Sequence, residues 1–434
     1  MKKFAKGFGV AFLGGALIIG VSPLLFSSSL VENSSALLSS VVPERKPRQK
    51  TPEELIAEAR ARSSDIRALY MTADVASDPG AGAARLRDAI IDIAEHTEIN
   101  AIVMDVKEVC GPDYDEENLK KLLDELKAKN IWAIARIVAF KDASQIKAHP
   151  EWYLTRASPK AVREGGCKGK QHLVAKGAGA EASRIFWRDN TGGYWLDPAS
   201  SPARAYLITL SKHMIDMGFD ELQFDYVRFP SDGDVSQALY PTWDRATPRY
   251  DVMRSFFVEL RDSLKAYKPD IILSADIFGY VAAQHEDPTI GQRLSDIVRT
   301  FDYVSFMVYP SHYYSGLYLA ANPARGLPAI SYTVAEARAN PDVTVGRSLI
   351  VAQDYFDLVA STSRATTSPE SAQTIARIRP WLEDFFHEAD RLAGRPWGAQ
   401  KVRLQIDAAQ DSTGHGWMLW NAANVYTKGA LKEE

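Results

Sequence analysis

The chain has 434 residues, of which 46% are hydrophobic and 10% aromatic, a composition typical of a globular protein with a large core. The length suits one barrel-sized domain with insertions or two ordinary domains. A formal net charge of −4 gives no reason to expect a nucleic acid partner. Nine tryptophans are present, and those in predicted loops suit either core packing or the stacking of flat ligand faces.

Residues 1–30 are predicted to be an export signal. Two lysines precede an apolar run from about Phe8 to Phe26, and a Ser-rich segment follows. Small residues at 34–36 offer a cleavage site, whereas the run approaches the roughly 20 residues that span a bilayer. A cleaved signal peptide and a membrane anchor therefore both remain open. Either one places the rest of the chain outside the cytoplasm, secreted or anchored to the outer face of the cytoplasmic membrane.

Residues 31–62 are predicted to be a linker that ends in a short helix. The segment PERKPRQKT, from Pro43 to Thr51, is rich in proline and charge, which is typical of a solvated tether. A helix is expected from about residue 52 to residue 62. The remaining residues, 63–434, form the predicted globular domain.

Strand and helix patterns alternate along this domain. Period-two or apolar runs predict eight strands: Ala68–Thr72, Ala101–Lys107, Ile131–Val138, Glu221–Val227, Ile271–Ile277, Tyr303–Tyr309, Val402–Asp407 and Trp417–Asn421. Amphipathic helices are expected at about Ala83–His96, Glu116–Lys129, Ala203–Met217, Val252–Tyr267, Pro288–Thr300 and Gln373–Leu392. Such alternation implies parallel strands joined by right-handed crossovers.

Eight such units favour a closed α/β fold, the (β/α)8 TIM barrel, over an open doubly wound sheet. Two connections, residues 139–202 and 310–370, are much longer than usual. They follow strands three and six, and long loops of this kind tend to be functional. No Gly-x-Gly-x-x-Gly motif follows the first strand, so nothing supports nucleotide binding.

The fourth strand carries the most informative pattern. Glu221, Gln223 and Asp225 alternate with apolar neighbours, although a buried parallel strand usually reads as continuous Val, Ile and Leu. A barrel interior accommodates a polar face of this kind. Because active sites of such barrels lie at the carboxyl ends of the strands, Asp225 is expected on the floor of the site.

Seven strands deliver polar residues at their carboxyl ends. The predicted set comprises Asp105, Lys107 and Glu108 from strand two, Arg136 from strand three, Asp225 and Arg228 from strand four, Asp276 from strand five, Tyr309, Ser311 and His312 from strand six, Gln405 and Asp407 from strand seven, and Asn421 from strand eight. We interpret this coincidence as an active site. The residues predicted to bind substrate there are Asp105, Lys107, Arg136, Arg228, Tyr309, His312, Gln405 and Asn421.

Two carboxylates that face each other are the requirement for glycosidic cleavage. Asp225 and Asp276 come from adjacent strands and are predicted to be the nucleophile and the acid/base. Arg228 and Tyr309 are expected to keep Asp225 ionised, and Asp276 needs a raised pKa. Asp105, Asp225 and Asp276 offer an alternative site for a hard divalent cation. No histidine has zinc-ligand spacing, and neither a metal nor another cofactor is predicted.

Cys110 and Cys167 are the two cysteines of the chain. They follow strands two and three and so fall on the same face of the predicted barrel. For an exported protein, a disulfide between them is one of the open alternatives.

Several segments resemble a known family. ALYMTADVA, NAIVMDVKE, IARIVAFKD, GFDELQFDYVRFPSDG, SADIFGY, IGQ, MVYPSHYY and WMLWNAANVY are together similar to a bacterial family of glycoside hydrolase domains with a TIM-barrel fold, near the alpha-amylase-like barrels. The resemblance covers about Arg67 to Tyr426. In the amylase-like group, an Asp that ends strand four and is followed by a basic residue is the nucleophile, which Asp225 and Arg228 match. That group has Glu as the acid on strand five, where this chain has Asp276.

These observations predict a glycoside hydrolase that cleaves an envelope or extracellular polysaccharide or oligosaccharide by a two-carboxylate mechanism. Two alternatives remain: a non-catalytic carbohydrate-binding barrel of the envelope, and a cation-assisted hydrolase of a cell-wall polymer. A monomer is expected, because no heptad run or exposed edge strand suggests an assembly surface.

Overall fold

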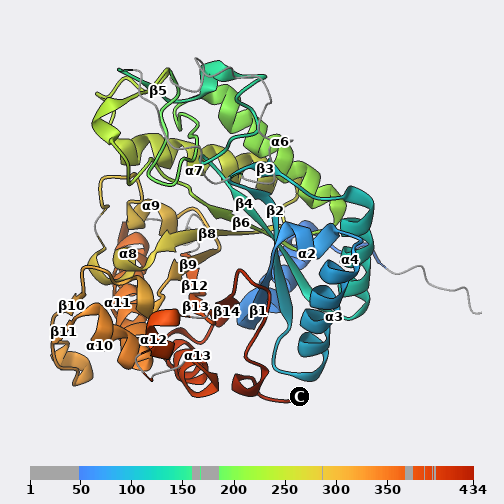
Figure 1. The fold of residues 1–434 in the computed structure, drawn as a ribbon, viewed down its shortest axis with the longest axis vertical. Coiled ribbons are helices and arrows are strands. Elements are labelled where there is room, and N and C mark those ends of the chain that lie inside the picture. Colours follow the sequence, from blue (N-terminus) through green and yellow to red (C-terminus); the bar gives the residue numbers. More distant parts are fainter. Residues whose placement is uncertain are drawn as a thin grey trace, which may run out of the picture. The chain divides into compact units, whose positions relative to one another are not determined.

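Eight parallel strands close into a barrel in the computed structural model of the chain (Figure 1). The structure describes residues 48–158, 167, 185–285, 287–366, 375–385, 387–392, 394 and 397–434. In barrel order the strands are β1 (Ile66–Met71), β2 (Ala101–Glu108), β4 (Trp132–Val138), β6 (Glu221–Asp225), β8 (Ile272–Phe278), β9 (Tyr303–Met307), β13 (Trp381–Glu383) and β14 (Gly416–Trp420). Closure occurs where β1 pairs with both β2 and β14. The predicted TIM-barrel fold is therefore confirmed.

Helices lie outside the ring of strands (Figure 1). They are α2 (Ala73–Ser77), α3 (Ala81–His96), α4 (Glu116–Ala128), α6 (Ser201–Met217), α7 (Arg249–Tyr267), α8 (Gly279–Gln284), α9 (Leu294–Val298), α10 (Val334–Ala339), α11 (Pro341–Thr366), α12 (Glu388–Leu392) and α13 (Ala399–Thr413). Their apolar faces pack on the strands and form the larger core cluster. None of the helices in the described ranges is long and apolar enough to cross a membrane, and the run from Phe8 to Phe26 lies outside those ranges.

Helix α1 (Pro52–Arg62) begins the described part of the chain, as predicted. Thr51 caps its first turn in a capping box with Glu54, which satisfies two otherwise unpaired backbone donors. At its other end, the Arg62 guanidinium lies 4.9 Å from the centroid of the Trp132 ring. Since Trp132 begins β4, the helix packs against the amino-terminal end of the barrel.

Short strands lie in the connections between the barrel strands. They are β3 (Gly111–Pro112), antiparallel to β2; β5 (Thr155–Arg156), paired with β7 (Ala238–Leu239); β10 (Leu317–Leu319), paired with β11 (Ile330–Tyr332); and β12 (Arg377–Ile378), paired with β9. The hairpin of β10 and β11 and the helices α10 and α11 all lie in the connection predicted for residues 310–370. That connection therefore carries more regular structure than the sequence suggested.

The polar face of β6 points into the barrel, as expected. Glu221 accepts hydrogen bonds of 2.9 Å from Arg379 and of 2.6 Å from Ser274 Oγ at the amino-terminal end. Gln223 donates to Ser305 Oγ at 3.1 Å in the next layer. Asp225 stands at the carboxyl end of the strand. Each polar side chain of the strand thus has at least one enclosed partner, which offsets part of the cost of burying it, although the Gln223 Oε1 atom is buried without one.

The prediction for strand seven is wrong. Residues Val402–Asp407 lie inside α13, where Val402, Ile406 and Ala409 form a buried face at helical spacing. The seventh barrel position is held instead by β13, preceded by β12. Both strands fall inside the predicted helix Gln373–Leu392, of which only α12 is helical. The predicted helix Pro288–Thr300 is likewise reduced to α9.

Candidate active site

A cavity of about 460 Å³ opens at the carboxyl ends of the strands. Its walls are Arg136, Asp225, Tyr226, Arg228, Asp276, Phe278, Gly279, Tyr280, Gln292, Met307, Tyr309, His312, Tyr313, Tyr314, Trp381 and Trp420. The volume falls within the roughly 300–1,000 Å³ of sites that bind small molecules. Aromatic rings with a few charged groups on the floor make this cavity the candidate active site.

Arg136 is the centre of the floor. Its Nη1 donates to Asp105 Oδ1 at 2.5 Å, its Nη2 donates to Asp225 Oδ2, and its Nε lies 3.4 Å from Asp276 Oδ2. All four side chains are at least nine-tenths buried. One guanidinium therefore acts as counterion to three carboxylates from three different strands, which a planar fork of donors is suited to do.

Asp225 is held as an acceptor on both of its oxygens. Besides the bond from Arg136, its Oδ1 accepts a 2.6 Å hydrogen bond from the backbone N–H of Tyr226. Tyr226 has a φ of 51°, a left-handed conformation that is uncommon for a residue with a side chain. The turn ends β6 directly after Asp225 and aims that N–H back at the carboxylate. Both oxygens of Asp225 therefore accept a hydrogen bond from a donor of fixed position.

Asp276 is in a different electrostatic state. It is 1% exposed, and burial together with the neighbouring Asp225 carboxylate raises its pKa well above the ordinary value for an aspartate. A hydrogen bond of 2.8 Å from Trp381 Nε1 to Oδ1 and the nearby Arg136 oppose this rise. The site thus pairs Asp225, which accepts from two donors, with Asp276, whose raised pKa favours its proton, as acid-assisted hydrolysis requires of one of its two carboxyl groups.

Aromatic residues behind the floor keep these groups in place. Trp420 stacks on Tyr70 with 3.9 Å between ring centroids and lies under the Arg136 guanidinium at 4.9 Å. The Tyr70 hydroxyl donates to Asp105, so Asp105 receives one bond from each side. Asp105 is absent from the cavity wall. In the structure it orients Arg136, and its predicted contact with substrate stays a prediction.

Arg228 lines the cavity, but it does not contact Asp225 as predicted. Its guanidinium lies 4.7–5.0 Å from the ring centroids of Trp195, Tyr226 and Phe278. Its Nη1 donates to the Phe229 carbonyl and to Ser231 Oγ. Burial lowers the pKa of Arg228. Arg136, rather than Arg228, is therefore the direct partner of the Asp225 carboxylate.

Tyr309 and His312 lie on the cavity wall, at the end of β9. Burial raises the pKa of Tyr309 well above its ordinary value. Ser311 Oγ donates to Glu383 Oε2 at 2.7 Å and lies 2.9 Å from His312 Nδ1. Because the single hydroxyl proton of Ser311 goes to Glu383, Nδ1 must donate to Ser311. The neutral ring then carries its acceptor on Nε2, and partial burial lowers the pKa of His312, which favours that neutral form.

Three further predicted binding residues lie away from the central cavity. Lys107 is fully buried and pairs with Asp142 at 2.9 Å, because a register irregularity after Asp105 takes it out of the inward alternation. Gln405 lies in α13 and bonds the backbone of Glu383. Asn421 follows β14 and donates to two backbone carbonyls at the edge of a second cavity. None of the three lines the central cavity, and their predicted contacts with substrate stay predictions.

The sequence reading missed Trp381, Glu383 and Trp420. Trp381 and Glu383 alternate on β13, but the strand was assigned to a helix. Trp420 continues the inward alternation from Met418 along β14, so a shift of one position would have selected it in place of Asn421. Period-two spacing was the available signal in β14, whereas β13, with three residues, is too short to show a period.

A cation site is disfavoured because Arg136 occupies the space between the three carboxylates. Within the described ranges, no group of three or more His, Cys, Asp or Glu is arranged to hold a metal ion. The positive charge that a divalent ion would bring is here supplied by the guanidinium.

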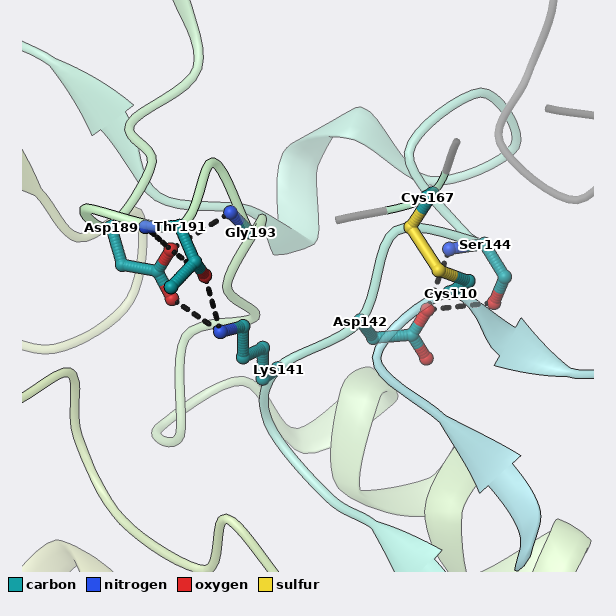
Figure 2. The surroundings of a disulfide bond; sticks show 8 residues. All are labelled: Cys110, Lys141, Asp142, Ser144, Cys167, Asp189, Thr191 and Gly193. Atoms are coloured by element: carbon teal, nitrogen blue, oxygen red, sulfur yellow. Dashed lines mark hydrogen bonds and ion pairs between the residues drawn. A yellow bond between two sulfur atoms is a disulfide. The ribbon is translucent and has the colours of Figure 1, made fainter. Parts of the chain in front are cut away.

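A disulfide joins Cys110 to Cys167 beside the strand ends (Figure 2). Figure 2 also shows Asp142, which accepts hydrogen bonds from the backbone N–H and the hydroxyl of Ser144. Nearby, Lys141 pairs with Asp189 at 2.7 Å. The covalent link ties a residue of the long connection after β4 to the end of β2.

Residues 68–426 match the family described as "Putative glycosyl hydrolase domain". No curated protein matches the chain.

Among solved structures, a hypothetical protein from Ruminiclostridium thermocellum is 27% identical, with a TM-score of 0.35, over 48% of this chain and 96% of that one. An alpha-amylase from Geobacillus thermoleovorans is 12% identical, with a TM-score of 0.43, over 84% and 72%. The glycoside hydrolase domain of PelA from Pseudomonas aeruginosa is 12% identical, with a TM-score of 0.38, over 83% and 96%. Because the family match spans nearly the whole barrel, the chain belongs to this family of glycosyl hydrolase domains.

Proposed function

We propose that the chain hydrolyses glycosidic bonds of an envelope or extracellular polysaccharide, with Asp225 as nucleophile and Asp276 as acid/base. The observation that carries the proposal is the contrast between these two carboxyl groups. Both face the same aromatic cavity and the same guanidinium, yet Asp225 is held by two donors while burial raises the pKa of Asp276.

The first step transfers a proton and breaks the glycosidic bond. Asp276 gives its proton to the leaving oxygen as an Asp225 oxygen bonds to the anomeric carbon. In the second step, Asp276, now a carboxylate, takes a proton from water. The water oxygen bonds to the anomeric carbon and releases Asp225. Arg136 stays on the shared edge of both groups and stabilises each carboxylate while it is ionised.

The cavity wall provides surfaces for a sugar. Aromatic rings such as Tyr280 and Tyr314 offer flat apolar faces to the C–H side of a pyranose. The His312 Nε2 acceptor and the Arg228 donors are able to bind hydroxyl groups. These features support a carbohydrate substrate. The disulfide between Cys110 and Cys167 supports export of the protein, because disulfides persist in oxidising compartments.

The test is mass spectrometry of cell-wall and exopolysaccharide preparations after incubation with the purified protein. Asp225→Asn is compared with Asp105→Asn, a matched change in the same cluster at a residue that does not face the cavity. New oligosaccharides from the wild type that disappear with Asp225→Asn support the proposal. Unchanged products with Asp225→Asn contradict the assigned nucleophile. Glycan binding by both proteins without any products would favour a non-catalytic binding barrel.

A chelator separates the cation-assisted alternative. With Arg136 as the internal counterion, turnover should be the same before and after treatment with EDTA. Loss of turnover that returns when a divalent cation is added would contradict the two-carboxylate mechanism.

A further inference from the structure

The central cavity adjoins a further cavity on each of two sides. A second cavity of about 530 Å³ lies against the ends of β13 and β14. A third, of about 340 Å³, lies beside the ends of β6 and β8. Each is of the size that binds a ligand by itself. The site around Asp225 therefore stands between two flanking spaces.

Shared residues connect the second cavity to the central one. Trp420 belongs to the walls of both. Phe385, a wall of the second cavity, packs edge-on against two residues of the central wall, with ring centroids 5.6 Å from Tyr309 and 5.9 Å from His312. The two spaces thus share one aromatic wall residue, and the rings of Phe385, Tyr309 and His312 are in contact where they adjoin.

The third cavity shares Phe278 and Tyr280 with the central one. Tyr280 is fixed where it stands, because its hydroxyl accepts a 2.9 Å hydrogen bond from the Ser315 backbone and its ring packs on Tyr313 at 5.1 Å. The lining of the third cavity also includes Ser231 and Gln284. Both offer polar groups next to an aromatic face.

We propose that the three cavities form one groove across the mouth of the barrel, and that the protein cleaves internal bonds of a glycan chain lying along it. The inference rests on the proposed hydrolase function and adds the mode of attack. A chain-end enzyme needs a site that is closed on one side of the cleaved bond. Here ligand-sized space continues on both sides of the two carboxyl groups, so sugar units extend in both directions.

The second cavity has walls suited to bind sugar. Trp397 and Phe385 supply aromatic surface, and Trp397 is held by a 3.2 Å hydrogen bond from its Nε1 to the Glu383 carbonyl. Asp384 stands beside them and accepts bonds of 2.7 and 2.6 Å from the backbone and hydroxyl of Thr427. A ring face beside an oriented carboxyl group is the combination that stacks a pyranose and binds its hydroxyls.

The experiment follows chain length and new reducing ends together. The full chain is incubated with borohydride-reduced soluble polysaccharides: an α-1,4-glucan, a β-1,3-glucan, a β-1,4-mannan and a poly-N-acetylhexosamine, alongside the preparation that the product assay identifies. Light scattering reports chain mass and a reducing-sugar assay reports bonds cut. Internal cleavage predicts that the mass falls steeply while few new ends appear. If the mass instead falls slowly, in proportion to the release of short products of one length, the protein cleaves from a chain end and the proposed groove is wrong.

Two variants outside the catalytic floor test the flanks. Trp397→Ala empties part of the second cavity and Gln284→Trp fills the third. Loss of one aromatic contact should raise KM for long chains about tenfold, while kcat/KM for a short aryl glycoside stays at the wild-type value. Trp397→Phe should restore most of the loss, which a folding defect would not allow. Equal effects on short and long substrates overturn the proposal, whereas no new ends from any polysaccharide would overturn the hydrolase function itself.

Discussion

Replacing Arg136 by methionine tests the central claim that one guanidinium makes three buried carboxyl groups compatible. The side chain lies within ion-pair distance of Asp105, Asp225 and Asp276, and no more than a tenth of any of the four is exposed. Methionine keeps much of the volume and removes the charge. The variant should therefore fold less stably because the carboxylates lose their shared counterion.

The loss of stability in Arg136→Met can be estimated from the distances between the charged groups. For the contact with Asp105, 2.5 Å, Coulomb's law at an effective dielectric constant of about 20 gives about 7 kcal/mol. Breaking a buried ion pair typically costs about 3–5 kcal/mol. The three contacts do not add, because the remaining carboxyl groups can take up protons. We expect the free energy of unfolding at pH 7 to fall by about 3–5 kcal/mol.

The loss should depend on pH. A buried carboxylate without a counterion has a raised pKa in the folded state. Such a group contributes stability below its unfolded pKa of about 3.9, and that stability is lost as pH rises through the folded value. The deficit of Arg136→Met relative to wild type should therefore be largest at pH 7 and smaller at pH 4.

Urea unfolding at pH 7 and pH 4 measures the free energy that Arg136→Met loses relative to wild type, and two matched variants serve as controls. Arg136→Lys keeps the charge and should lose less. Arg379→Met removes the other buried arginine of the barrel interior, which binds Glu221 at the opposite end; it should cost a similar free energy and leave the pH profile of turnover unchanged. A deficit below about 1 kcal/mol for Arg136→Met, the level of an exposed ion pair, or an equal deficit at both pH values, would refute the reasoning.

Further predictions concern single groups. Asp276→Asn should lower kcat by about 10²–10⁴-fold, the usual contribution of a general acid. Because its raised pKa makes Asp276 cost stability as pH rises through that value, the variant should gain stability over wild type at high pH in urea unfolding; a gain only at low pH would contradict the sign. Replacing Cys110 and Cys167 by serine removes a disulfide that joins residues 57 positions apart. From the loop entropy of the unfolded chain, the free energy of unfolding should fall by about 4 kcal/mol, and an unchanged value would contradict this prediction. Lys107→Met should lower the free energy of unfolding by about 3–5 kcal/mol, because it leaves the buried Asp142 without its cation. KM should stay unchanged, and a raised KM would indicate that Lys107 contacts substrate.

The fold could be predicted because its signals are local. Seven of the eight barrel strands carry apolar runs or period-two alternation that a reader of the sequence can see, and the polar face of β6 indicated an enclosed interior. The exception, β13, is three residues long and is separated from β12 by Arg379 and Pro380. With so few residues, neither strand shows a period, and the surrounding sequence resembled a helix.

The candidate site was predicted only in part. Asp225 and Asp276 were identified because each ends a recognisable strand, and both face the cavity. Arg136 was expected to bind substrate, and its position as the common counterion could not be foreseen. That position depends on how far three strands are staggered when the barrel closes, which no local pattern encodes.

Seven of the barrel strands, the polar face of β6 and the carboxyl groups at the ends of β6 and β8 could thus be predicted from the sequence, since those properties follow from the spacing of residues along one segment. Only the tertiary structure decided that Arg136 joins three carboxylates, that Lys107 is sequestered with Asp142, and that Trp381 supports Asp276. These contacts join residues far apart in the chain, and a shift of one residue in strand register would change all of them.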